Sequence, residues 1–180
     1  MVLVGMMAVG KTTVGNKVAK LLGRPFHDAD DELVRRTGRT VAEWFTAEGE
    51  EGFRAVEAEV LAALLDDPVP SVVALGGGAV TVASNRARLR DPDRAVVVWL
   101  EADAAFLAAR AKRKSHRPLL AEGDPLATLT RLCTQREPWY REVADVVLPV
   151  APVYRDADKP KRDLARMVVD AVAAYGILVP

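Results

Sequence analysis

A glycine-rich segment near the start of the chain has the spacing of a loop that holds phosphate. Residues 5–13 read GMMAVGKTT, in which two glycines are separated by four residues and Lys-Thr follows the second. Glycines let the backbone turn so that several N–H groups converge on phosphate oxygens, and the helix that follows adds its N-terminus. The lysine is expected to reach the β- and γ-phosphates of ATP, and the first threonine to ligate Mg²⁺. The predicted nucleotide-binding residues are therefore Gly5, Ala8, Val9, Gly10, Lys11, Thr12 and Thr13.

This loop does not identify the group that receives the phosphate. GTPases, motor ATPases and small-molecule kinases all use it. The chain has no Asn-Lys-x-Asp motif, which counts against a GTPase, and the apolar segment 71–75 runs into glycines where many ATPases place an acidic residue. A short chain with a polar loop at 114–124 is most consistent with a kinase for a small molecule.

Acidic residues follow the second apolar segment of the chain. Asp28 and Asp30 are two apart, so an extended backbone would put both carboxylates on one face. Open α/β sheets bind ligands at the carboxyl ends of their strands, which is where these residues are expected. The alternative is that Asp30 and Asp31 cap the next helix.

Two arginines are candidates for gripping a carboxylate. Arg54 and Arg136 could each form two parallel hydrogen bonds to a carboxylate, which lysine cannot reproduce. Glu57, one helical turn after Arg54, could hold that guanidinium in place. The alternative is that both arginines form surface ion pairs of little energetic value.

Three consecutive glycines end the third apolar segment, at Gly76, Gly77 and Gly78. Their cost in backbone entropy indicates that another group approaches the main chain closely. The alternative is a flexible turn with positive φ angles.

The elements that must position these residues alternate along the chain. Apolar strands are expected at 1–5, 26–28, 71–75, 95–100 and 146–150, and helices at 11–22, 31–65, 84–90, 103–113, 125–142 and 161–175, with a loop at 151–160. This alternation predicts an α/β fold with a parallel sheet covered on both faces.

Composition sets further limits. The chain has 180 residues, with 25 basic and 25 acidic side chains, and this balance argues against a general nucleic-acid or membrane-surface binder. A single cysteine cannot form an internal disulfide, and no apolar run approaches a membrane span. We therefore expect a cytoplasmic protein, with a monomer as the default.

Six segments in this order resemble shikimate kinase over residues 1 to about 150. They are GMMAVGKTT at 5–13, DADDE at 28–32, FR at 53–54, LGGGAV at 75–80, RPLL at 117–120 and REPWYREVAD at 136–145. The resemblance implies a P-loop fold like that of nucleoside monophosphate kinases, with a five-stranded parallel sheet of order 2-3-1-4-5 in one domain over 1–180. It implies a lid at about 112–124 and a substrate-binding helical segment at about 31–62. The implied reaction is Mg²⁺-dependent transfer of the ATP γ-phosphate to the 3-hydroxyl of shikimate, in aromatic amino acid biosynthesis.

The same resemblance implies a role for each matched residue. Asp28 would support Mg²⁺ with Thr12, and Asp30 would accept hydrogen bonds from the substrate and take the proton of the attacking hydroxyl. Arg54 and Arg136 would bind the substrate carboxylate, and the three glycines would flank its ring, Gly77 through a backbone hydrogen bond. The remaining assignments are Arg117 over the ATP phosphates, Pro118 and Leu119 over the substrate, Arg110 near the adenine, and Phe45 or Trp44 lining the pocket.

The chain also departs from the family pattern. Ala8 stands where the family usually has glycine, and its methyl group would be strained if its φ angle were positive. Segment 151–160 differs from the family's adenine-binding loop, and Arg155, Lys159 and Pro160 are all candidates for the adenine contact. Two alternatives to a shikimate kinase stay open: a kinase for a related cyclitol or polyhydroxy acid, aminoshikimate-like or gluconate-like, and a weakly active ligand-binding relative.

Overall fold

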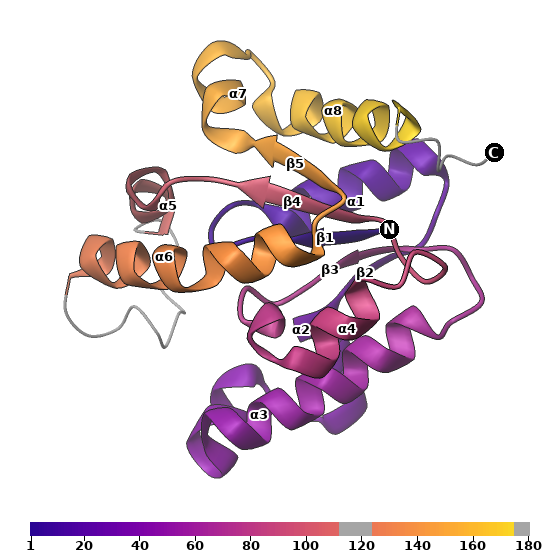
Figure 1. Ribbon diagram of the computed structural model, residues 1–180, viewed down its shortest axis with the longest axis vertical. Coiled ribbons are helices and arrows are strands. Elements are labelled where there is room, and N and C mark those ends of the chain that lie inside the picture. Colours follow the sequence, from indigo (N-terminus) through magenta and orange to yellow (C-terminus); the bar gives the residue numbers. More distant parts are fainter. Residues whose placement is uncertain (112–123, 175–180) are drawn as a thin grey trace.

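The computed structural model describes residues 1–111 and 124–174, which contain a five-stranded parallel sheet (Figure 1). The strand order is β2-β3-β1-β4-β5, as predicted. The strands are β1 Val2–Val4, β2 Phe26–Asp28, β3 Val72–Ala74, β4 Val97–Glu101 and β5 Val146–Pro149. All are within a few residues of the expected segments.

The sheet register brings the loops that carry the chemistry to one edge. Leu3 of β1 pairs with Ala74 of β3 and with Val98 of β4, and Asp28 of β2 also pairs with Ala74. The three strands β1, β2 and β3 therefore end level with one another. The phosphate loop, the acidic segment and the three glycines follow directly from these ends, which explains how distant sequence segments meet.

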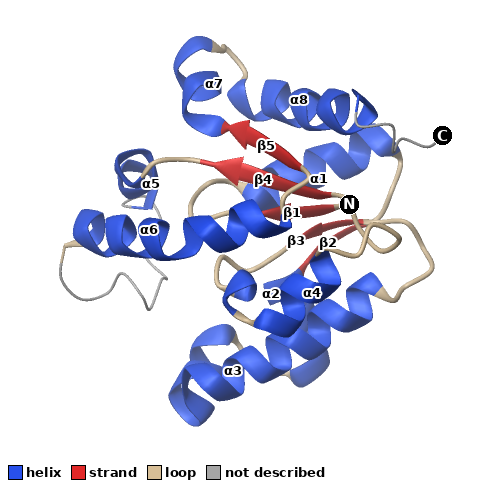
Figure 2. Ribbon diagram, in the orientation of Figure 1, coloured by secondary structure: helices blue, strands red, loops and turns tan. Residues whose placement is uncertain are grey.

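Helices cover both faces of the sheet (Figure 2). α1 and α8 pack against each other on one face, and α4 and α6 lie on the other. The helices are α1 Lys11–Leu22, α2 Ala29–Thr37, α3 Val41–Leu65, α4 Ala83–Leu89, α5 Ala104–Ala111, α6 Pro125–Val143, α7 Val150–Asp156 and α8 Pro160–Ala174, with a 3₁₀ turn η1 at Ala79–Thr81.

The helical stretch expected at 31–65 is two helices, of which the second is kinked. Thr40 begins α3 with a capping box, in which its side chain accepts from the Glu43 N–H and the Glu43 side chain accepts from the Thr40 N–H. Gly49 interrupts the same helix with φ 69° and ψ −172°, a conformation open only to glycine. The kink divides α3 into a short arm that carries Phe45 and a long arm that carries Arg54.

The loop predicted at 151–160 is wrong. Residues 150–156 form α7, with Pro152 in its first turn. Proline is compatible with a first helical turn, because the N–H groups there have no intrahelical partner to lose. The two prolines indicated a loop, whereas they in fact lie in the first turns of two helices, since Pro160 begins α8.

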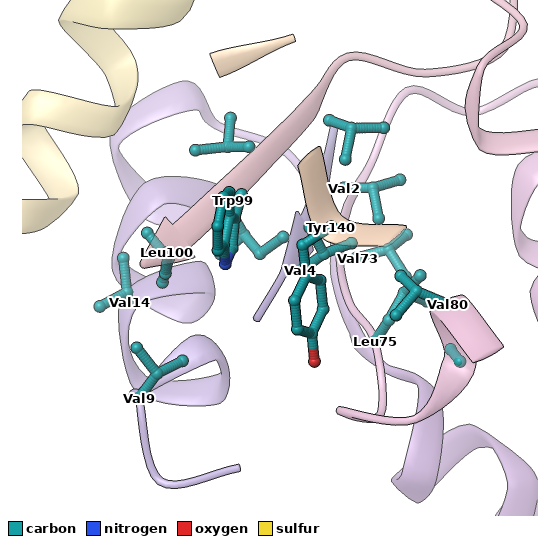
Figure 3. Packing of buried hydrophobic residues seen from close by; sticks show 14 of the residues in the cluster. Val2, Val4, Val9, Val14, Val73, Leu75, Val80, Trp99, Leu100 and Tyr140 are labelled. Atoms are coloured by element: carbon teal, nitrogen blue, oxygen red, sulfur yellow. The ribbon is translucent and has the colours of Figure 1, made fainter. Parts of the chain in front are cut away.

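The core fills both sides of the sheet with aliphatic side chains from the strands and inward helix faces. Figure 3 shows Val2, Val4 and Val73 of the strands beside Val14, Trp99 and Tyr140. Among the described residues, no helix combines the length and the apolar character needed to span a bilayer.

Candidate active site

The phosphate loop lies between β1 and α1. Positive φ angles and a close backbone contact explain why glycines are needed in it. Gly5 has φ 141° and Gly10 φ 111°, and a Cβ on Gly5 would lie 2.5 Å from the carbonyl oxygen of Leu100. Lys11 begins α1 and folds back over the loop, where its Nζ donates to the carbonyls of Gly5 at 2.7 Å and Met6 at 3.0 Å. These contacts place the ammonium group over the loop.

Ala8 has a positive φ angle, the conformation in which its methyl group is strained. Its φ is 68°, the one positive value outside glycine in the described part of the chain. Its carbonyl accepts from Nε of Arg110 at 3.0 Å, which ties the loop to α5. Val9 is fully buried with its side chain in the core (Figure 3), so only its backbone can face a phosphate.

The oxygens predicted to support Mg²⁺ lie side by side. The Thr12 hydroxyl donates to Oδ2 of Asp28 at 2.7 Å. A hydroxyl and a carboxylate suit a hard cation that takes its other ligands from phosphate and water. The described residues contain no group of three or more His, Cys, Asp or Glu side chains that could hold a metal ion without such help.

The capping alternative for Asp30 and Asp31 is wrong, and so is the extended backbone assumed between Asp28 and Asp30. Asp28 ends β2 and is itself the N-cap of α2, where its carboxylate accepts from the Asp30 N–H at 3.1 Å. Asp30 therefore lies in the first helical turn. A Cβ added to Gly76 would lie 3.2 Å from Oδ1 of Asp30, so the carboxylate faces the glycine turn.

The surroundings of Asp30 favour a proton acceptor. Surrounding protein atoms raise the pKa of this carboxyl above its usual 3.8, although the residue as a whole is exposed; the Asp28 carboxylate raises it further, and Lys11 opposes both. A carboxylate with a raised pKa is a better general base than an ordinary surface aspartate.

Arg54 projects from the long arm of α3 and is held on several sides. Its Nη1 donates to Oε2 of Glu57 at 2.7 Å, the i+3 pairing that the sequence predicted, and its Nη2 to Oε1 of Glu50 at 3.1 Å. The guanidinium carbon lies 5.0 Å from the ring centre of Phe53 and 6.0 Å from that of Phe45. Phe45 thus reaches Arg54, whereas the Trp44 indole donates to the Thr37 hydroxyl.

Arg136 reaches the same place from α6 on the opposite wall. The residue is only 4% exposed, and its Nη1 donates to the carbonyl of Gly77 at 3.0 Å. Arg54 meets the next residue, because a Cβ on Gly78 would clash with its Nη2. The two guanidinium groups therefore converge on adjacent glycines and are not surface ion pairs.

Unsatisfied polar atoms concentrate at this point. Arg54 Nε, Arg136 Nε and Glu57 Oε1 are the buried side-chain nitrogen and oxygen atoms that lack a partner within the described ranges. Burial raises the pKa of Glu57, and Arg54 only partly offsets this. Buried donors without partners are costly, so a bound carboxylate would satisfy the two arginines and stabilise the site.

The three glycines are explained by close approach and not by a flexible turn. None of them has a positive φ angle. A Cβ on Gly76 would lie 2.5 Å from Oε1 of Glu57, and one on Gly77 would lie 3.0 Å from the backbone nitrogen of Met7. Each glycine is thus in contact with a different part of the site, and Gly77 separates the phosphate loop from the arginines.

The side of the phosphate loop nearest α5 contains a residue that the sequence analysis missed. Arg110 lies against both Tyr154 of α7 and Phe106, whose rings meet edge to face, with its guanidinium carbon 4.3 Å and 5.2 Å from the two ring centres. Lys159 is exposed, and no described contact joins its side chain to Arg110. Tyr154 was overlooked because the segment was expected to be a loop. Arg117, Pro118 and Leu119 lie outside the described residues, and their predicted roles stay predictions.

Comparisons with known proteins agree with this geometry. The family model described as "Shikimate kinase" matches residues 7–171. A shikimate kinase of Caulobacter vibrioides is 48% identical over 141 residues, which cover 78% of this chain and 69% of that protein. One from Bordetella pertussis is 47% identical over 173 residues, covering 96% and 78%.

A solved structure is similar over almost the whole chain. Shikimate kinase from Acinetobacter baumannii in complex with shikimate has 39% sequence identity and a TM-score of 0.88, with 98% of this chain and 94% of that chain covered. The ordered motifs, the sheet order and these matches agree, and the chain belongs to the shikimate kinase family.

Proposed function

We propose that this protein transfers the γ-phosphate of ATP to the 3-hydroxyl of shikimate, giving shikimate 3-phosphate and ADP. The observation that carries the proposal is the convergence of two guanidinium groups, that of the half-buried Arg54 and that of the buried Arg136, on a glycine turn that touches the phosphate loop. A small ring acid held there by its carboxylate would present a hydroxyl towards the nucleotide. Family membership and the shikimate complex of the Acinetobacter baumannii relative support the same substrate.

The residues of the chain divide the chemical work between them. The phosphate loop binds the nucleotide, and Lys11 neutralises charge on its terminal phosphates. Asp30 accepts a hydrogen bond from the attacking hydroxyl and takes its proton, for which its raised pKa is suited. Arg54 and Arg136 orient the acceptor through its carboxylate, so that the hydroxyl meets the phosphate in line.

Thr12 and Asp28 would hold Mg²⁺ together with the nucleotide phosphates. When bound, the ion would neutralise the charge that develops on the transferred group. On the base side, Arg110 and Tyr154 offer flat surfaces against which an adenine can stack.

We further infer that the chain works as one domain and as a cytoplasmic monomer. Its reaction needs only small molecules, and the family model spans most of the chain, residues 7–171. The aromatic amino acid pathway is the metabolic setting that family membership supplies.

A coupled assay of ADP release tests the proposal directly. The purified protein, with ATP and Mg²⁺, is offered shikimate, an aminoshikimate-like acid, gluconate and a neutral cyclitol in parallel. We expect turnover with shikimate to exceed that with the other acceptors by orders of magnitude, and Lys11→Ala to abolish it. Preferential turnover of gluconate or of the cyclitol would refute the assignment of the acceptor, and absence of all turnover would indicate a ligand-binding relative.

A further inference from the structure

The carbonyl oxygen of Gly77 is held by two donors from the same helix. The Tyr140 hydroxyl donates to it at 2.6 Å and Nη1 of Arg136 at 3.0 Å. Tyr140 follows Arg136 by four residues, so the two side chains emerge one above the other on one face of α6. The shorter of the two bonds belongs to the residue for which the sequence and the proposed reaction give no role.

The Tyr140 ring has a rigid support. The residue is 1% exposed and stacks on Trp99, with ring centres 5.6 Å apart and planes inclined by 18°. Trp99 pairs in the sheet with Val4, the last residue of β1 before the phosphate loop. Figure 3 shows the ring among the core side chains, with the hydroxyl pointing out of the cluster. The oxygen therefore has a fixed position relative to the loop.

Fixing the Gly77 carbonyl also fixes the neighbouring N–H group. A peptide unit is planar, so the C=O of Gly77 and the N–H of Gly78 point in opposite directions as one rigid group. Neither the Gly77 nor the Gly78 N–H donates to any acceptor within the described residues. The Gly78 N–H shares its peptide unit with the carbonyl that Tyr140 holds, so its direction depends on that carbonyl, whereas the Gly77 N–H belongs to the preceding peptide.

The same contact supports Arg136. Its guanidinium donates one N–H to Gly77 and has a second nitrogen, Nε, buried without a partner. If the Gly77 carbonyl were free to move, the guanidinium would move with it. Burial raises the pKa of the Tyr140 hydroxyl above its already high ordinary value, so the group remains a donor throughout any practical assay range.

We propose that Tyr140 is a positioning residue for the acceptor: its hydroxyl holds the Gly77 carbonyl, and thereby sets the Arg136 guanidinium and the Gly77–Gly78 peptide in the orientation that binds a small carboxylic acid beside the phosphate loop. The inference rests on the proposed function and adds a residue to it. Tyr140 acts through Gly77 and Arg136 and touches neither reactant.

The substitution Tyr140→Phe removes one oxygen and keeps the ring and its stacking on Trp99. We expect KM for shikimate to rise about two- to thirteenfold, the range for loss of one hydrogen bond of about 0.5–1.5 kcal/mol. The Kd of shikimate, measured by calorimetry without nucleotide, should rise by the same factor. KM for ATP should stay within about twofold of wild type, because the phosphate loop keeps its own contacts.

Two controls separate positioning from general packing. Leu129→Ala removes buried apolar contacts from the same helix, about three turns before Tyr140, and leaves the Tyr140 ring stack in place, so it should lower Tm and leave the Kd of shikimate within about twofold. In an Arg136→Lys background, Tyr140→Phe should cost less than it does alone, because the two residues act through one carbonyl. If Tyr140 had a purely structural role, the fold increases in the Kd of shikimate caused by Tyr140→Phe and by Arg136→Lys would multiply in the double variant.

The inference is overturned if Tyr140→Phe binds shikimate as tightly as wild type, if KM for ATP rises equally, or if Leu129→Ala weakens shikimate binding to the same degree. These outcomes are distinct from failure of the proposed function. If the wild-type protein does not phosphorylate shikimate, the acceptor assignment is wrong; if it does and Tyr140→Phe is unchanged, only the role of Tyr140 is wrong.

Discussion

Glu57 shows how burial changes what a single charged residue contributes. The sequence predicted its i+3 contact with Arg54, which a surface helix would also allow at little gain. In the folded protein the Glu57 side chain is almost fully buried, and one of its carboxylate oxygens has no partner among the described groups. Burial outweighs the arginine and raises the pKa of this carboxyl above 4.5.

The raised pKa predicts a pH-dependent stability. A group whose folded pKa exceeds its unfolded value binds more protons when folded, so its contribution is complete below pH 4.5 and is lost as the pH rises through the folded pKa. Glu57→Gln cannot titrate. We expect the difference in Tm, variant minus wild type, to become steadily more positive from pH 4 to pH 7. A difference that stays constant, or that favours wild type more at pH 7, would contradict this balance.

Arg136 is the residue at which lysine should be least acceptable. A lysine cannot donate in parallel to a carboxylate while also holding the Gly77 carbonyl. Loss of a hydrogen bond to a charged group costs about 1.5–3 kcal/mol, which corresponds to roughly a 10- to 150-fold rise in KM for shikimate upon Arg136→Lys. KM for ATP should change little.

The matched control is Arg141→Lys, because the Arg141 guanidinium pairs with the exposed Glu137; this variant should leave both KM values unchanged. If Arg136→Lys raised KM equally for ATP and for shikimate, Arg136 would not be the residue that binds the acceptor carboxylate.

Ala8 is a position at which glycine should not destabilise the fold. A left-handed conformation costs a non-glycine residue about 1–2 kcal/mol, and the greater freedom of glycine in the unfolded chain offsets about 0.4–1 kcal/mol of the relief. We expect Ala8→Gly to leave the free energy of unfolding unchanged or to raise it by up to about 1.6 kcal/mol, as measured by urea denaturation. Ala55→Gly on an exposed helical position should instead cost about 1 kcal/mol. A loss at Ala8 as large as that at Ala55 would mean that the loop is not strained.

At the scale of elements, the kink in α3 brings the two arms of the helix together around Arg54. Phe45 on the short arm packs on Phe53 of the long arm, with ring centres 4.6 Å apart. Gly49 makes this possible, and nothing lies within 4 Å of the Cβ that another residue would add there. The kink therefore depends on backbone conformation and not on space.

Gly49→Ala should therefore act through the backbone. Forcing alanine into this conformation costs about 1–3 kcal/mol, and relaxation of the kink would withdraw Phe45 from Arg54. We expect a lower Tm and a several-fold higher KM for shikimate. Gly23→Ala, at the equally open left-handed end of α1, should lower Tm alone. If both variants kept the wild-type KM, the short arm would have no part in acceptor binding.

At the scale of the whole molecule, the sheet edge makes one continuous site from three separate loops. The phosphate loop, the first turn of α2 and the glycine turn all meet at Gly76 and Gly77. Arg54 and Arg136 enclose that point from helices on different sides of the glycine turn. A ligand bound there contacts several of these elements at once and should stabilise the folded state.

This arrangement predicts a ligand-dependent shift in thermal unfolding. Shikimate at about 100 times its Kd should add about 2.7 kcal/mol to the free energy of unfolding. For a chain of this length that is a rise in Tm of roughly 5–10 °C. Gluconate at the same concentration should produce no comparable rise, and Arg136→Lys should remove most of the shift. An equal shift with gluconate would argue against a site built for a ring acid.

The sequence by itself determined the alternation of strands and helices, the phosphate loop, and the bounds of α1 and β2 almost to the residue. These features depend on neighbours within a few positions: apolar periodicity, glycine spacing, and the Gly23 stop. The sheet order came from resemblance to a family, because no local pattern specifies which strands pair.

Only the tertiary structure decided which aspartate caps α2, why three glycines stand together, and that Tyr140 contacts the glycine turn and Tyr154 the Arg110 guanidinium. Each of these depends on contacts between residues far apart in the chain, such as Tyr140 with Gly77, or on a helix, α7, where two prolines indicated a loop. Local sequence determines the shape of each segment, but only packing determines which side chains meet, because the meeting point is defined by several segments at once.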